Sequence, residues 1–149
     1  FLSELRKYLG NQTMRGEKIK VEGPVGDIHV KATGPGLVYM VYATQVSPKE
    51  DERVVKKIEN VVAEAEKAKA SVAVLVTKLD EKAIELSRSK TINVIDIFHG
   101  IEARGVWTGD QVLSKFLAEK LGLALVSYDE NPKGSYTPAQ FKDALDKMT

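Results

Sequence analysis

The stretch that decides the fold is GDIHVKA at residues 26–32, followed by the turn TGPG at 33–36 and by LVYMVYAT at 37–44. Both flanking runs are rich in β-branched and aromatic residues, which favour extended backbone, and the Gly-Pro-Gly sequence between them is typical of a tight connection. We therefore expect a β-hairpin with strands over 27–32 and 37–46. A single acidic residue, Asp27, stands at the start of its first strand.

A further strand and a helix precede this hairpin. Residues 17–22 alternate between apolar and charged side chains, as in a half-buried strand with one face in water. Residues 1–9 carry leucines at helical spacing and end at Gly10-Asn11, which predicts a short helix. Residues 1–46 are thus expected to form a helix followed by a three-stranded meander.

Helices and strands alternate in the rest of the chain. Ser47 as N-cap and Pro48 at the first helical position predict a helix that runs to about Ala70. The apolar runs at 71–77 and 92–98 suit buried strands, and strands that alternate with helices are expected to pair in parallel. The remaining signals are a helix capped by Asp80, a helix opened at 108–110 and ended by Gly122, a strand at 123–128, and a last helix opened by a capping box from Thr137 to Gln140.

This order of elements predicts an α/β protein in which helices cover both faces of a mixed central sheet, a three-layer α/β/α architecture. With 149 residues the chain has the length of one domain. We expect a core of order αβββαβ over about 1–98 and a C-terminal αβα extension over about 99–149.

The composition excludes several classes of site. The chain has 22 basic and 21 acidic residues, so its net charge of +1 gives no general attraction to nucleic acid. It contains no cysteine, which removes disulfides, thiolate zinc sites and cysteine nucleophiles. A reducing compartment, the cytoplasm, is the expected location. No apolar run is long enough to span a membrane, so no membrane partner is expected. A surface rich in lysine and glutamate is compatible with a heat-adapted source.

The hairpin resembles the signature of the restriction-endonuclease-like superfamily, whose motif is written PD-(D/E)xK. The run at 26–30 and the strand at 38–44 are similar to its Gly-Asp-Ile-Asp-Val hairpin and Glu-x-Lys strand. The runs at 74–77, 81–86 and 92–96 resemble its later strand, helix and strand. The likeness is to the branch of Mrr-type restriction enzymes and archaeal Holliday-junction resolvases. It implies a nuclease fold over about 1–98 and a role in DNA repair, recombination or processing.

The resemblance also implies that the catalytic motif is degenerate. In that family an Asp at the hairpin start and an acid on the next strand hold Mg²⁺, and a lysine two residues later orients or activates water. Asp27 matches the first acid, but the second acid position falls on Tyr42 and the lysine position on Thr44. A neutral phenol is a poor ligand for Mg²⁺, and threonine carries no cation. His29 stands where some relatives have a further acid. No cofactor is therefore expected.

An active nuclease with relocated ligands is the alternative. One carboxylate binds Mg²⁺ or Mn²⁺ weakly, so Asp27 would need acids from elsewhere in the chain. Asp27 is equally typical of a residue that caps a turn, and His29 of a strand residue on a partly exposed face. The acids that could supply the missing ligands are Glu4, Glu22, Asp51 and Glu52.

Two groups of residues suggest partners. Basic residues along the first strands, with His29 beside them, form a candidate surface for DNA phosphates, although a solvated edge strand carries lysines equally well. Trp107, the only tryptophan, is a candidate anchor for a protein partner, or else a residue that covers the core. The basic residues are Arg15, Lys18, Lys20 and Lys31, with Arg104 in a later loop.

Three functions follow from these patterns. The first is a catalytically inactive nuclease-like domain that binds nucleic acid or anchors a larger complex. The second is an active metal-dependent nuclease built around Asp27. The third is a protein-interaction module that uses the segment after Phe98. A homodimer is also expected, because relatives of the resembled fold are often dimers.

Overall fold

The structure, a computed structural model, describes residues 1–90, 92–103 and 111–148. Five strands follow the first helix, and helices then separate most of the later strands. In chain order the elements are α1 (Leu2–Gly10), β1 (Thr13–Met14), β2 (Glu17–Lys18), β3 (Lys20–Glu22), β4 (Val30–Gly34), β5 (Leu37–Ala43), α2 (Glu52–Ala68), β6 (Ser71–Val76), α3 (Glu81–Ser89), β7 (Asn93–Asp96), β8 (Ile101–Glu102), α4 (Gln111–Leu121), β9 (Val126–Ser127) and α5 (Pro138–Met148).

One mixed sheet runs through the centre, with its strands in the order β3-β4-β5-β6-β7-β8-β9. β3, β4 and β5 form an antiparallel meander, and β5, β6 and β7 are parallel because α2 and α3 carry the chain back between them. The register of the β4–β5 hairpin pairs Val30 with Val41 and Gly34 with Leu37. The mixed sheet expected from the sequence is confirmed.

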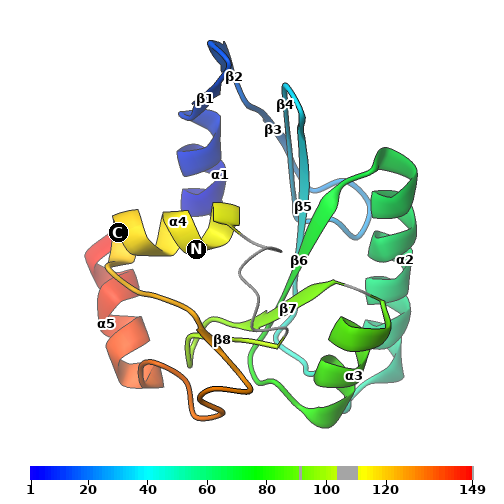
Figure 1. Cartoon of the computed structure of the whole chain (residues 1–149), viewed down its shortest axis with the longest axis vertical. Coiled ribbons are helices and arrows are strands. Elements are labelled where there is room, and N and C mark those ends of the chain that lie inside the picture. Colours follow the sequence, from blue (N-terminus) through cyan, green and yellow to red (C-terminus); the bar gives the residue numbers. More distant parts are fainter. Residues whose placement is uncertain (91, 104–110, 149) are drawn as a thin grey trace.

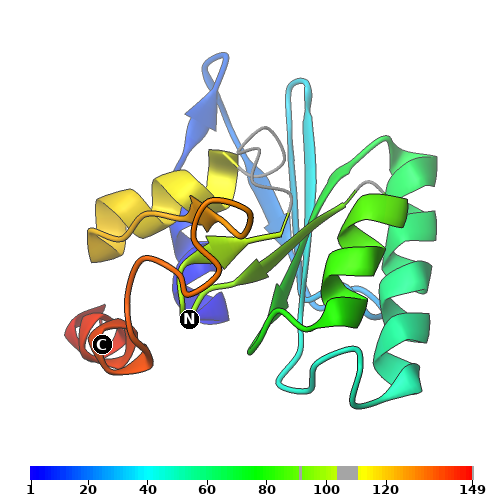
Figure 2. The same ribbon diagram turned by 60° about the horizontal axis from the view of Figure 1, so that its bottom comes forward.

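Helices cover both faces of this sheet (Figure 1). α2 and α3 pack on one face, where Ile58 and Val74 are fully buried. α1, α4 and α5 pack on the other, where Leu5, Phe116 and Phe141 are buried. Figure 2 shows α2 and α3 side by side on one side of the sheet, with α4 and α5 on the other. The expected three-layer α/β/α architecture is therefore confirmed.

The segment expected as a C-terminal extension completes one of these layers. The ring of Phe116 in α4 has its centroid 5.2 Å from that of Tyr8 and 5.5 Å from that of Phe1. The Tyr8 hydroxyl donates a hydrogen bond to the Glu119 carboxylate, and burial together with this bond raises the pKa of Tyr8 to about 12. Helices from the two ends of the chain thus share one apolar cluster.

The single strand expected at 17–22 is wrong, because the chain divides at Ile19. β2 turns back on β1 in a separate two-stranded hairpin, and only β3 joins the main sheet. Arg15 and Gly16 form the connection at φ values of 53° and 82°, the geometry of a two-residue hairpin turn. Arg-Gly is not one of the residue pairs that usually signal such a turn.

The start of α2 also differs from the prediction. Its N-cap is Asp51, whose carboxylate accepts a hydrogen bond from the Arg53 N–H at 2.9 Å. Ser47, the expected cap, is buried, and its hydroxyl donates to the Lys78 carbonyl at 3.2 Å. A long-range hydrogen bond therefore uses the serine, and the acid four residues later opens the helix instead.

The last strand pairs differently as well. β9 is parallel only to β8, a two-residue strand that runs antiparallel to β7. A strand of two residues has no detectable period, so the sequence gives no sign of β8. The prediction that the later strands pair in parallel therefore holds for β6 and β7, and β9 also pairs in parallel, but with β8, whose own pairing with β7 is antiparallel.

The predicted helix ends that depend on hydrogen bonds between residues a few positions apart are confirmed. Asp80 accepts a hydrogen bond from the Ala83 N–H at 2.8 Å, and Gly122 ends α4 at a φ of 66°. Thr137 and Gln140 exchange the two hydrogen bonds of a capping box at 2.8 and 3.2 Å. In the part of the chain that the structure describes, no helix is long and apolar enough to cross a membrane.

Candidate functional site

The open end of the β4–β5 hairpin brings the nuclease-like positions together. Asp27 lies in a tight turn closed by two backbone hydrogen bonds between Val25 and Ile28, with N···O distances of 2.8 and 2.9 Å. Gly23 passes so close to the His29 carbonyl that a Cβ at Gly23 would lie 2.2 Å from its oxygen. Asp27 therefore lies in a turn that precedes β4, and the expectation that it starts the strand is wrong.

The imidazole of His29 is held in place on two sides. Its Nδ1 accepts a hydrogen bond from the Ala43 backbone N–H at 3.0 Å, and its ring stacks on Tyr42 with centroids 5.3 Å apart. Nδ1 can accept a hydrogen bond only when it carries no proton. This contact therefore requires the neutral ring and ties the start of β4 to the end of β5.

The surroundings of His29 favour the same neutral state. Burial lowers the pKa of His29 from its ordinary value of 6.5; the Asp27 carboxylate opposes this shift, and the cations of Lys57 and Arg6 add to it. Arg6 also donates from Nη1 to the His29 backbone carbonyl at 3.5 Å. Two cations from helices on opposite faces of the sheet thus lie near the hairpin end.

We expect this end of the hairpin to lose stability in mild acid. The fold lowers the pKa of His29, so the neutral ring contributes to the free energy of unfolding. This contribution is fully present above pH 6.5 and is lost as the pH falls through the lowered pKa. His29→Asn keeps an acceptor for the Ala43 N–H but does not titrate. Between about pH 7 and about pH 4.5, Tm should fall a few degrees further in the wild type than in this variant. Equal pH dependence of the two proteins would contradict the assignment.

Tyr42 and Thr44, at the positions of the missing acid and lysine, have structural partners of their own. Tyr42 is 5% exposed and packs toward α2. Burial raises the pKa of Tyr42, and the carboxylates of Asp27 and Asp51 raise it further. A hydrogen bond with the Thr44 side chain acts in the opposite direction and lowers this pKa. Thr44 Oγ1 donates to the Val46 carbonyl at 2.9 Å and accepts its N–H at 3.1 Å. Neither side chain carries a charge at neutral pH.

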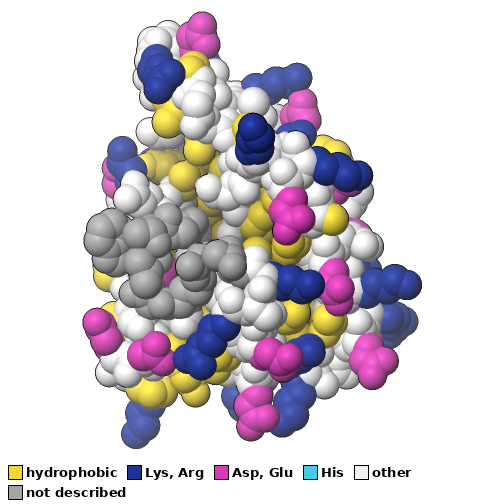
Figure 3. Space-filling view, turned by 45° about the vertical axis from the view of Figure 1, so that its right-hand side comes forward, with side chains coloured by type: hydrophobic (Ala, Val, Ile, Leu, Met, Phe, Trp, Pro, Cys, Tyr) yellow, Lys and Arg dark blue, Asp and Glu magenta, His cyan; other side chains and the backbone are white. Residues whose placement is uncertain are grey.

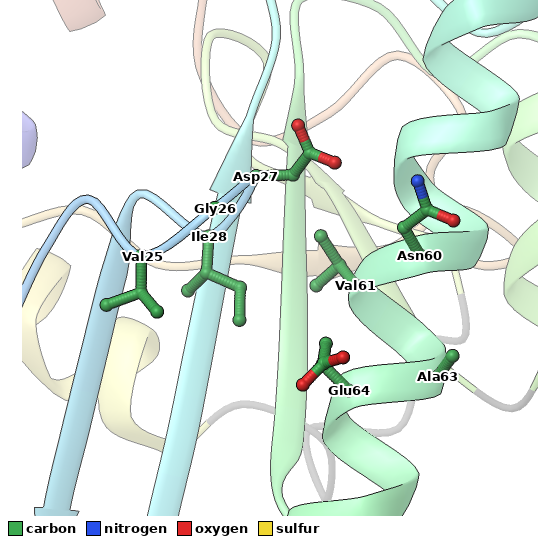
Figure 4. A pocket seen from close by; sticks show the side chains of 8 residues that line it. All are labelled: Val25, Gly26, Asp27, Ile28, Asn60, Val61, Ala63 and Glu64. Atoms are coloured by element: carbon green, nitrogen blue, oxygen red, sulfur yellow. The ribbon is translucent and has the colours of Figure 1, made fainter.

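A cavity of about 350 Å³ lies between the Asp27 turn and helix α2 (Figure 4). Asp27 and Asn60 approach it from opposite sides, Ile28 and Val61 form an apolar floor, and Glu64 lies one helical turn beyond Asn60. Among the described residues, no group of three or more His, Asp or Glu side chains could together hold a metal ion. The cavity therefore offers carboxylate and amide groups without a formed metal centre.

Three of the four acids considered as relocated ligands take part in ion pairs or caps. Glu22 pairs with Lys20 at 2.9 Å, and Asp51 both caps α2 and pairs with Arg53 at 3.0 Å. Glu4 pairs with Lys7 at 3.5 Å, and Glu52 is exposed at the start of α2. The acid that lines the cavity together with Asp27 is Glu64, which no sequence pattern indicated as a ligand.

The basic residues expected to contact DNA fall into two groups. Lys31 stands opposite Met40, whose side chain packs toward α2, so Lys31 lies on the same face as Tyr42. Lys20 is on the neighbouring strand β3, opposite Thr33 of β4. Arg15 and Lys18 instead belong to the β1–β2 hairpin, and the Arg15 guanidinium packs near the turn at 33–36, the opposite end of the β4–β5 hairpin from His29. Arg104 and Trp107 lie outside the described residues.

No sequence pattern indicated the two cations that lower the pKa of His29, Lys57 and Arg6. Arg6 follows an apolar residue of α1, and Lys57 lies on the charged side of α2, which is typical of a helix face in water. Their approach to His29 depends on how both helices pack on the sheet. No local pattern in the sequence could have identified them.

Comparison with known proteins gives no match for this chain at a significant level, whether against family models, curated proteins or solved structures.

Proposed function

We propose that this chain is a nuclease-like domain of the PD-(D/E)xK type that does not cleave and that binds nucleic acid as a subunit in DNA repair, recombination or processing. The observation that carries the proposal is the state of Tyr42 and Thr44. The strand that would supply the second acid and the lysine supplies a buried phenol and a hydroxyl bound to its own backbone.

Cleavage of a phosphodiester by this class of enzyme needs hard oxygen ligands for Mg²⁺ and a group that activates water. A neutral phenol stacked on an imidazole does neither, since burial raises the pKa of Tyr42 further above neutrality. The His29–Tyr42 pair instead closes the hairpin end as a structural unit. Loss of cleavage with retention of the fold is then consistent with a binding role.

Cations near the hairpin end support a role in binding nucleic acid, although the net charge of the chain is only +1. Arg6 and Lys57 lie near His29, and Lys31 is on the face that holds Tyr42. Figure 3, which brings α2 forward, shows basic and acidic side chains interspersed over this face. Binding through a few cations on such a surface is expected to be weak and to depend strongly on salt.

The test is binding of labelled single-stranded, duplex and branched DNA at several salt concentrations with Mn²⁺ present, with each sample then run on a denaturing gel. We expect salt-sensitive binding and intact DNA. In the triple variant Arg6→Gln, Lys31→Gln and Lys57→Gln, affinity should fall at least about tenfold, and the slope of log K against log salt should fall by about 2–3.

A matched triple variant controls for the loss of charge alone. Lys90→Gln, Lys115→Gln and Lys142→Gln remove three exposed cations from other parts of the chain. Its binding should stay within about twofold of wild type at moderate salt, since it removes no cation near the hairpin end. Equal losses of DNA affinity in the two triple variants would refute the proposal that DNA binds at the hairpin end. Absence of DNA binding at low salt would favour a protein-scaffolding role instead.

The second candidate is an active nuclease with relocated ligands, and one observation favours it: Asp27 and Glu64 line the same cavity. With scissile phosphate oxygens completing the coordination, two carboxylates could hold Mg²⁺ or Mn²⁺. This reading predicts cleavage that Asp27→Asn and Glu64→Gln each abolish. Intact DNA with the wild-type protein favours the binding-only function.

A further inference from the structure

A second cluster of functional side chains lies at the end of β7. Asp96 is the last residue of this strand, is 1% exposed, and accepts hydrogen bonds from the His99 Nδ1 at 2.7 Å and from the His99 backbone N–H at 3.1 Å. A carboxylate that bonds Nδ1–H fixes the tautomer of the imidazole and leaves Nε2 available to a ligand. The cluster shares no residue with the hairpin end.

The backbone of His99 is clamped by the loop that precedes α5. The His99 carbonyl accepts a hydrogen bond from the Ser135 N–H at 2.7 Å. Gly134 packs against the same carbonyl so closely that a Cβ there would lie 1.8 Å from the oxygen. The side chain of His99 is 36% exposed, so a rigid backbone holds a ring that still reaches solvent.

His99 lines a cavity of about 300 Å³ together with Lys78, Lys133 and Tyr128. Leu79 and Ile101 supply apolar walls. This volume is at the lower end of the roughly 300–1,000 Å³ range of small-molecule pockets. Lys78 follows β6 and Asp96 ends β7, so the cavity lies at the carboxyl ends of two adjacent parallel strands. Ligands of open α/β sheets bind at this edge.

The charges around this cavity favour an anion. Among the described residues that line the cavity, Asp96 is the one carboxylate, and it is buried and bonded to His99. Lys78 and Lys133 are exposed and form no ion pair with another described residue. Two ammonium groups and one imidazole therefore belong to the described lining of this cavity, and the one carboxylate in that lining is already bonded to the imidazole. Compact cations of this kind bind phosphate as point charges.

We propose that Asp96, His99, Lys78 and Lys133 form a binding site for a phosphate group, either inorganic phosphate or a small phosphate monoester. Nε2 of His99, which carries a lone pair when Nδ1–H is bonded to Asp96, accepts a hydrogen bond from the P–OH group of the phosphate monoanion. The two lysines neutralise the charge of the anion, and Asp96 acts as a positioning residue for the ring. The apolar walls leave room for a small substituent on the ester. The site does not depend on the nuclease-like hairpin.

The test uses the histidine signals of the full chain. There are two histidines, His29 and His99, so one variant of each assigns both imidazoles by NMR. Inorganic phosphate, a nucleoside monophosphate and the matching nucleoside are titrated separately to concentrations on the order of 10 mM, above the Kd of about 1 mM expected for a small ligand. We expect the His99 signals to shift and saturate with one or both phosphate compounds while those of His29 stay fixed.

Variants connect this shift to the lysines. Lys78→Ala and Lys133→Ala should each weaken phosphate binding about tenfold, because each removes one charge-assisted hydrogen bond. Lys56→Ala, on α2, should leave it unchanged. Saturation with inorganic phosphate alone identifies the free anion as the ligand, and tighter binding of the nucleoside monophosphate identifies the ester. An absent His99 shift, an equal shift with the nucleoside, or a shift that neither lysine variant alters would overturn the proposal.

Discussion

Replacement of Phe116 by alanine is expected to lower the free energy of unfolding by about 4 kcal/mol, since fully buried aromatic residues cost about 3–5 kcal/mol when truncated. Phe116 is 0% exposed and contacts the rings of Tyr8 and Phe1, so its removal leaves a cavity between α4 and α1. Chemical denaturation followed by far-UV circular dichroism measures the change.

Lys115→Ala is the matched control, because it alters the neighbouring exposed residue of the same helix. It should change the free energy of unfolding by less than about 0.5 kcal/mol. A single transition in the Phe116 variant is expected, because α1 and α4 share one apolar cluster. Two separate transitions, or a loss below about 1 kcal/mol, would show that α4 contributes little to this layer.

Replacement of Gly134 by alanine is expected to cost about 3 kcal/mol. The residue has a φ of 89°, which L side chains rarely adopt, and a Cβ would lie 1.8 Å from the His99 carbonyl oxygen. The loop must move away, so the hydrogen bond between Ser135 and His99 should also break. For a chain of this length the expected fall in Tm is about 10 °C.

Gly16→Ala separates the cost of a positive φ from the cost of the close contact with a carbonyl oxygen. Gly16 has a similar φ of 82°, but nothing lies within 4 Å of the position of its Cβ. This variant should cost about 1 kcal/mol, the price of the left-handed backbone alone. If both variants lose equal stability, the contact with His99 is looser than described. Solvent exchange of the Ser135 amide, measured by NMR, gives a second readout for the loop.

Features encoded by neighbouring residues could be predicted from the sequence. The caps at Asp80, Gly122 and Thr137 each satisfy backbone groups within a few positions, so a short pattern contains the whole interaction. The buried strand β6 was found because sheet and helices enclose both its faces and its residues are almost all apolar. These elements were sufficient to predict the three layers.

Features that depend on distant residues could not be predicted. Ser47 looked like a helix cap but bonds Lys78, 31 positions away. The candidate site was predicted only in part. Asp27, Tyr42 and Thr44 belong to one hairpin region, so the sequence pattern of that region identified them. Arg6 and Lys57 approach His29 from helices on opposite faces of the sheet, which no local pattern encodes. The Asp96–His99 pair spans only three positions in the sequence. Its cavity could not be predicted, because other lining residues come from the end of β6 and the loop before α5.

The bond between Tyr8 and Glu119 has a consequence for synthesis on the ribosome. The two residues are 111 positions apart, so at about 5–20 residues per second the partner of Tyr8 is made on the order of 5–20 s later. During that interval the apolar side chains of α1 lack the cover that α4 and α5 later provide. The nascent chain can pair its meander early, but this layer closes only after α4 and α5 have been made, and until then α1 is exposed to chaperones.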